Sequence, residues 1–92
     1  RRIITTVARY YDIKLEDLLG SSRKKQLVMP RQVTMYLMRT EIKASYPTIG
    51  QELGNRDHTT AMHAFEKINR ALGDNTTIQH DIHLIRQQLY ND

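Results

Sequence analysis

Apolar residues recur every three or four positions along most of this chain, which is the spacing of amphipathic α-helices. Stripes of this kind predict a first helix within residues 3–11 and a short second helix at 14–19. A third helix is predicted from Pro30 to about Ala44, because a proline in the first helical turn needs no backbone N–H. Its candidate core residues are Val33, Tyr36, Leu37 and Ile42.

A short fourth helix is indicated by Ser45, a suitable N-cap, and by Pro47, which fits the first helical turn. Gly54 tolerates a positive φ and is expected to end this helix. Asp57 is expected to cap a fifth helix that runs from His58 to about Leu72. The apolar face of the fifth helix consists of Ala61, Ala64, Phe65, Ile68, Ala71 and Leu72.

A sixth helix follows Gly73, with Asp74 or Asn75 as its N-cap and a regular apolar stripe. We find no convincing strand, repeat or linker. The pattern therefore predicts a single all-α domain over residues 1–92, with six helices in a compact arrangement. The fourth and fifth helices form a helix-turn-helix at about residues 46–72, and the other helices form its supporting core. The stripe of the sixth helix consists of Ile78, Ile82, Ile85 and Leu89.

Positive charge is concentrated in one part of the chain. The chain carries a net charge of +4, but residues 20–45 hold six basic residues and one acidic residue, a local net of +5. A local excess of this kind favours a polyanionic partner such as a nucleic-acid backbone. The basic loop, expected at residues 20–28, contains Arg23-Lys24-Lys25. By itself, such a run is equally typical of a solvated surface loop.

Several function classes lack support in the sequence. There is no cysteine for a disulfide or thiolate zinc site, and no apolar run near the ~20 residues of a membrane helix. Phosphate-loop and nucleophile-elbow motifs are absent, so we expect no catalytic residue and no enzyme. His80 and His83 have helical spacing for a metal, but a third ligand is missing and we expect none. The chain opens on Arg1 rather than methionine, which indicates a fragment of a longer protein.

The most specific motif is Gly54-Asn55-Arg56-Asp57-His58-Thr59-Thr60-Ala61. It places small hydrogen-bonding side chains on the first turn of the fifth helix, the turn that a helix-turn-helix protein inserts into the major groove. Thr59 offers a hydroxyl and a methyl group to a base edge, and Asp57 either caps the helix or accepts from a cytosine amino group. The spacing alone also fits an ordinary capped helix start.

The motifs of this chain resemble those of the C-terminal domain of the bacterial replication initiator DnaA, from about Ile4 to Ile68. In the same order, the resemblance is carried by Thr6-Val7-Ala8-Arg9-Tyr10-Tyr11, Asp17-Leu18-Leu19 with its basic loop, Pro30-Arg31-Gln32, Met35-Tyr36-Leu37, Pro47-Thr48-Ile49-Gly50 and the Gly54 motif. The resemblance implies a Trp-repressor-like helix-turn-helix that binds double-stranded DNA at replication-origin DnaA boxes. Asn55 and Ala61 depart from a common glycine and a common valine, with Ala61 expected near the base edges.

The resemblance also assigns roles to individual residues. It places Arg23 in the minor groove and makes Asp57, His58 and Thr59 the readers of the major groove. It implies phosphate contacts from Lys25, Arg31, Gln32, Arg39, Pro47, Thr60, His63 and Lys67.

The resemblance further implies partners and setting. The domain is expected to need no cofactor, with ATP bound by an ATPase domain of the parent protein. The apolar stripes contain no sustained heptad, so the domain is expected to be a monomer, and without a long apolar run it is expected to have no membrane contact. The resemblance places it in the cytoplasm at the nucleoid, whereas the parent oligomerises at the origin through other domains. The alternatives are a helix-turn-helix transcription regulator and a protein-interaction domain with a basic face.

Overall fold

The computed structural model describes residues 1–91, and over this range it contains six α-helices and no β-strand. This architecture confirms the predicted all-α fold. The helices are α1 (Arg2–Tyr11), α2 (Leu15–Leu19), α3 (Lys25–Glu41), α4 (Tyr46–Glu52), α5 (His58–Ala71) and α6 (Thr76–Tyr90).

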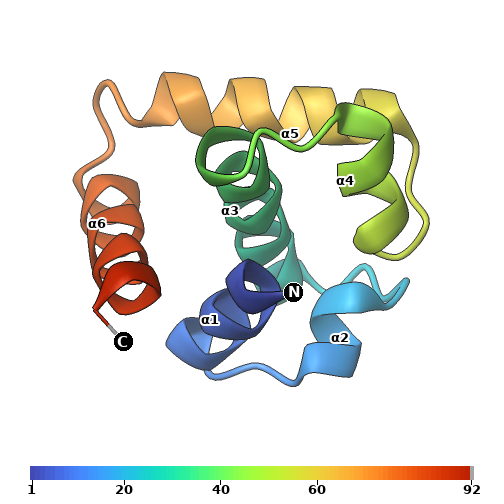
Figure 1. The fold of residues 1–92 in the computed structure, drawn as a ribbon, viewed down its shortest axis with the longest axis horizontal. Helices are drawn as coiled ribbons and strands as arrows, with labels where there is room; N and C mark the ends of the chain where they lie inside the picture. Colours follow the sequence, from blue (N-terminus) through green and yellow to red (C-terminus); the bar gives the residue numbers. More distant parts are fainter. Residues whose placement is uncertain (92) are drawn as a thin grey trace.

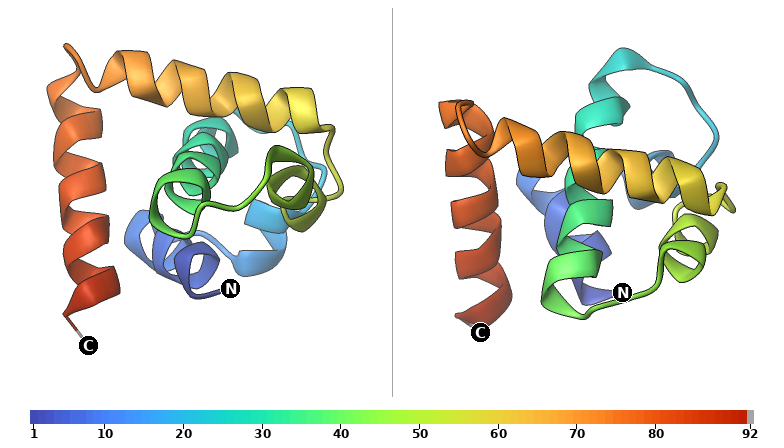
Figure 2. Two further views of the ribbon diagram at one scale, coloured as in Figure 1. Left: turned by 45° about the horizontal axis from the view of Figure 1, so that its top comes forward. Right: turned by 90° about the horizontal axis from the view of Figure 1, so that it is seen from above.

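The central element of the fold is α3, which packs against α1, α2, α4 and α5. Figure 1 shows α5 lying across α3, with α1 and α2 on the opposite side and α6 standing apart at one edge. In the two turned views of Figure 2, α5 still crosses α3, and α6 forms a wall beside α1, against which it packs. The arrangement leaves one long side of α5 uncovered by other helices.

The core draws buried side chains from all six helices, as the apolar stripes predict. Val33 and Leu37 of α3 are fully buried, and Tyr36 is nearly so. Ile42 was expected in the core and is instead 58% exposed. The reason is that α3 ends at Glu41, so the chain turns away at Ile42 and the side chain leaves the apolar face.

Three helix starts are capped as their sequences predict, by Ser45 on α4, Asp57 on α5 and Asn75 on α6. The side chain of Ser45 accepts a hydrogen bond from the N–H of Thr48 at 3.2 Å, which caps α4. Asn75, rather than Asp74, caps α6 by accepting from the N–H of Ile78 at 3.0 Å. Each cap satisfies a backbone donor that the helix itself leaves unpaired.

The start of α3 differs from the prediction. The helix begins at Lys25, so Pro30 lies inside it and the basic loop is confined to residues 20–24 instead of 20–28. Pro30 removes one helical hydrogen bond, which leaves the carbonyl of Gln26 unpaired by the helix. Gln26 is exposed, so water can satisfy that carbonyl, while Leu27 is buried and holds the first turn against the domain.

Candidate nucleic-acid interface

The turn between α4 and α5 is tight and has the conformation that its residues favour. Gly54 has φ +82° and Asn55 has φ +58°, so both occupy the left-handed region. Asparagine tolerates this region better than most residues, which explains how it replaces a glycine here. A Cβ at Gly54 would lie 2.6 Å from the carbonyl oxygen of Leu19, so the turn packs directly against the end of α2.

The first turn of α5 is exposed and polar. Asp57 caps it, with Oδ1 accepting from the N–H of Thr59 at 3.2 Å, and this bond lowers the pKa of Asp57. His58 Nδ1 lies 3.0 Å from the same oxygen, so the two side chains form an ion pair when His58 is protonated. Thr60 is exposed, Thr59 is partly exposed, and both are available to a ligand.

The expected place of Ala61 near base edges is wrong. Its side chain is fully buried against the core, on the inner face of α5. A larger residue at this position would alter the packing of α5 on the domain. The polar residues before it are therefore the ones that face outward.

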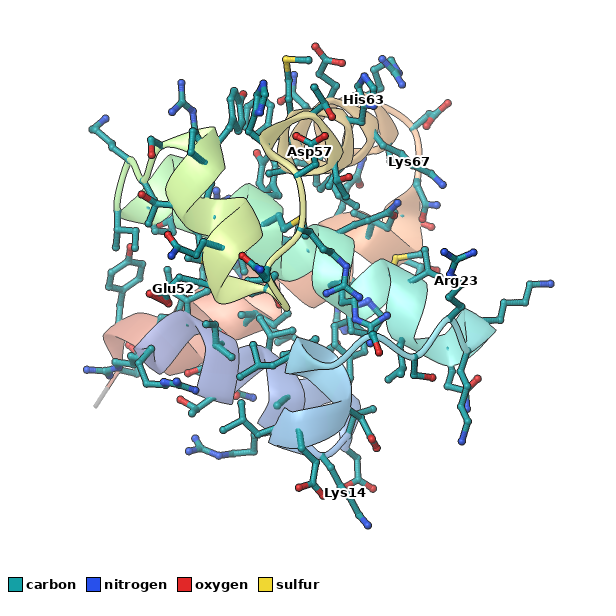
Figure 3. All side chains as sticks on the ribbon, turned by 90° about the vertical axis from the view of Figure 1, so that its right-hand side faces the viewer. Lys14, Arg23, Glu52, Asp57, His63 and Lys67 are labelled. Carbon is teal, nitrogen blue, oxygen red and sulfur yellow. The ribbon has the colours of Figure 1, made fainter. Side chains whose placement is uncertain are left out.

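An open groove of about 670 Å³ runs between the basic loop, α3 and one face of α5. Its lining contains five basic side chains and no acidic one, so its potential is positive. Figure 3 shows Arg23 projecting from the loop on the side where Lys67 and His63 project from α5, with Lys14 at the far end of the molecule. The polar and charged residues of the lining are Ser21, Ser22, Arg23, Arg31, Gln32, Arg56, Thr60, His63, Lys67 and Arg70.

The groove brings together several residues that were predicted to contact DNA. Arg23 is exposed, and within residues 1–91 it makes no hydrogen bond or ion pair that would hold its head group. Gln32, Thr60, His63 and Lys67 lie along the same groove. Lys25 is also exposed, but it belongs to the first turn of α3 and not to the loop.

Arg31 has a structural task that sequence reasoning missed. It is 6% exposed, and its guanidinium donates to the carbonyls of Leu18, Ser22, Asp17 and Gly20. Burial, and then the nearby charge of Arg56, lower the pKa of Arg31. Four of its five N–H donors are thereby occupied, so at most one N–H is left for the predicted phosphate contact.

Arg39 and Pro47 lie outside the groove. Arg39 donates to the carbonyl of Ala44 at 3.1 Å, and its head group stacks 4.4 Å from the ring centre of Tyr46. Tyr46 in turn contacts Phe65 of α5. Phe65 and Lys67 are two positions apart, so helical spacing places them on opposite flanks of α5. Pro47 is exposed at the start of α4. The predicted phosphate ligands thus divide between two flanks of α5.

Two basic residues of the groove, Arg56 and Arg70, were absent from the predicted site. Arg70 shares a face with His63 and Lys67, since these residues are spaced three or four apart along α5. Helical periodicity was the signal that would have found it. Arg56 lies within the Gly54 motif, but only the fold shows where its side chain goes.

Other kinds of site find no support in the described part of the chain. Within residues 1–91, no group of three His, Asp or Glu side chains is placed to hold a metal ion. Among the same residues, no helix has both the length and the apolar character to cross a membrane.

The exposed helix start, the tight turn before it and the basic groove beside it define a helix-turn-helix domain of the nucleic-acid-binding class. Within that class, the chain belongs to the family described as the bacterial dnaA protein helix-turn-helix, whose sequence profile matches residues 1–68.

Individual relatives agree with the family match. The chain is 48% identical over 83 residues to the chromosomal replication initiator protein DnaA of Levilactobacillus brevis, an alignment that covers 90% of this chain and 18% of the relative. It is 41% identical over 90 residues to the protein of that name from Lacticaseibacillus casei, an alignment that covers 98% of this chain and 20% of the relative. To the protein of that name from Thermomicrobium roseum it is 37% identical over 90 residues, an alignment that covers 98% of this chain and 19% of the relative. The chain therefore spans about a fifth of these relatives.

Proposed function

We propose that this domain binds a DnaA-box duplex by reading both grooves at once. The first turn of α5 enters the major groove with His58 and Thr59, and Asp57 lies at its edge. Arg23 enters the adjacent minor groove from the basic loop. The observation that carries this proposal is that Arg23 lines the same basic groove as Thr60, which follows His58 and Thr59 on the first turn of α5.

The positions of the remaining residues support a footprint on both phosphate backbones. A helix in the major groove has one backbone on each side. On one flank of α5, Gln32, Thr60, His63 and Lys67 line the groove. Arg39 and Pro47 lie on the other flank, beside Tyr46. Arg31 adds its one free N–H, and Lys25 adds a charge at the start of α3.

The chain's relatives are named as replication initiators, so we propose that this domain supplies origin recognition to a longer initiator in the bacterial cytoplasm, at the nucleoid. ATP binding and oligomerisation at the origin are assigned to other parts of such a protein. The domain itself binds the duplex as a monomer and uses no cofactor.

A binding titration tests this function. Fluorescence anisotropy would compare a DnaA-box duplex with a scrambled duplex at two salt concentrations. We expect the box to bind about 10³-fold more tightly, with a salt slope of about −3 to −4 for four basic phosphate ligands. Steep salt dependence without discrimination would contradict sequence reading. Binding too weak to measure on either duplex would favour a protein-interaction domain.

A further inference from the structure

Arg56 connects the turn of the helix-turn-helix to the loop that carries Arg23. Its Nη2 donates to the carbonyl of Gly20 at 2.8 Å, and its Nη1 donates to the carbonyl of Leu53. Gly20 is the first residue of the basic loop, three positions before Arg23. The side chain of Arg56 therefore joins the end of α4 to the start of the loop.

The carbonyl of Gly20 also has a second arginine partner. Arg31 of α3 donates to it through Nη2 at 3.1 Å and donates to the carbonyl of Ser22 as well. Two arginines from different elements thus converge on one carbonyl of the loop. Gly54 allows this approach, because any Cβ there would meet both Arg56 Nη1 and the carbonyl of Leu19.

We propose that Arg56 is a positioning residue that fixes Arg23 relative to α5, so that the minor-groove and major-groove readings fall in register on one duplex. This inference rests on the proposed two-groove function. A loop that is held before binding loses less conformational entropy when Arg23 enters the groove. Arginine suits the task because its planar head group donates in two directions at once, whereas a lysine ammonium is a point charge.

A double-mutant cycle between Arg56 and Arg23 tests the coupling. Among residues 1–91 the hydrogen bonds of the Arg56 side chain go to Leu53 and Gly20 and not to Arg23, so any coupling acts through the loop. Affinity for a DnaA-box duplex would be measured for the wild type, Arg56→Lys, Arg23→Ala and the double variant. We expect Arg56→Lys to weaken binding about five- to tenfold when Arg23 is present and less than about twofold when it is absent. An equal loss in both backgrounds would overturn the proposal.

A second variant separates positioning from direct phosphate contact. Arg56→Gln removes the charge, and we expect it to leave the salt slope unchanged, whereas a phosphate ligand would lower the slope by about one unit. A lowered slope would make Arg56 a DNA ligand and overturn the inference. Arg56→Gln also serves in the cycle if circular dichroism shows that Arg56→Lys does not fold.

Arg70→Ala is the matched control. Arg70 lines the same groove but makes no hydrogen bond to the loop among residues 1–91, so its loss should weaken binding equally with and without Arg23. A wild type that fails to discriminate the box from a scrambled duplex would refute the proposed function. Discrimination without coupling between Arg56 and Arg23 would refute the positioning role alone.

Discussion

At the start of α5, each side chain has a task set by its exposure and its hydrogen bonds. Asp57 holds the helix start, because its Oδ1 accepts from the N–H of Thr59. Ala61 is fully buried and belongs to the core. Between them, His58 and Thr60 are exposed and Thr59 is partly exposed, and these are the side chains that we propose for contact with a duplex.

Thr59→Ala should weaken binding to the DnaA box by roughly 1–3 kcal/mol and change binding to random DNA little. The helix cap survives this substitution, because the backbone N–H of residue 59 still donates to Asp57. The measurement is a titration of both duplexes at one salt concentration. The control is Thr60→Ala, at a proposed phosphate contact, which should lose equal affinity for the DnaA box and for random DNA. An equal loss for Thr59→Ala would assign it to the backbone.

Arg23→Lys should lose about tenfold in affinity, or roughly 1.4 kcal/mol, for a box whose A·T-rich flank is intact. The flat guanidinium fits a narrow A·T minor groove, and the hydrated ammonium does not. Replacing the flank by G·C pairs, which place an amino group in the minor groove, should remove most of the difference. Lys24→Ala should lose the same affinity on both flanks. A flank-independent penalty for Arg23→Lys would reduce the loop to an electrostatic anchor.

At the scale of elements, α6 is attached to the domain by polar contacts as well as by its apolar stripe. The hydroxyls of Tyr10 and Tyr11 on α1 donate to Asp81 at 2.6 and 3.0 Å. The hydrogen bond to Asp81, more than burial, raises the pKa of Tyr10 to about 12, and burial raises the pKa of Tyr11 further. Near the other end of α6, Arg86 pairs with Glu41 at 2.9 Å.

These contacts predict a loss of stability in alkaline solution. A phenol whose pKa is higher in the folded state contributes stability below its ordinary pKa of 10, and this contribution is lost as pH rises through its folded pKa. The free energy of unfolding should therefore fall above pH 10. Asp81→Asn removes the carboxylate whose hydrogen bond is the main cause of the raised pKa of Tyr10 and whose charge adds to the effect of burial on Tyr11, so it should flatten this fall. Urea unfolding from pH 8 to 11.5, with phenolate absorbance, measures it.

Identical pH profiles for the wild type and Asp81→Asn would contradict this account of how α6 is held. Lysine ionisation occurs in both proteins, so the difference between their profiles isolates the tyrosines. Tyr10→Phe provides a control, because it removes one titrating group while leaving the packing of α1 nearly unchanged.

At the scale of the whole molecule, the described residues form a compact domain. Its radius of gyration is 12.0 Å, as expected for a compact chain of this length. The large apolar side chains that are exposed among residues 1–91 are few and do not form a helical seam; they are Val28, Met29, Ile42 and Tyr90. The described residues thus form no helical seam of exposed apolar side chains against which a second copy of the chain would pack.

The free domain should therefore be a monomer. Sedimentation equilibrium should give a mass near 10.8 kDa that does not change with concentration. One domain that reads an asymmetric site in two grooves needs no two-fold partner. A stable dimer would contradict this prediction and favour the transcription-regulator alternative.

Much of the fold was predictable from the sequence, because caps, turns and apolar periodicity depend on residues a few positions apart. Ser45, Asp57 and the Gly54-Asn55 turn act as their local chemistry indicates. The bounds of α3 were not predictable in this way. Local rules place Pro30 in a first turn, whereas in the folded domain the helix begins at Lys25 and Leu27, in the turn before Pro30, is buried.

The sequence by itself determined the helix-turn-helix and the outward-facing start of α5, since both follow from short-range hydrogen bonds and helical spacing. Only the tertiary structure decided what Arg31 and Arg56 do. A positive charge in a local sequence predicts a phosphate ligand as readily as a structural clamp. Their side chains donate to carbonyls that lie 3 to 36 positions away in the chain. The hydrogen bonds between residues far apart in the sequence form only once α2, α3 and the turn have packed together.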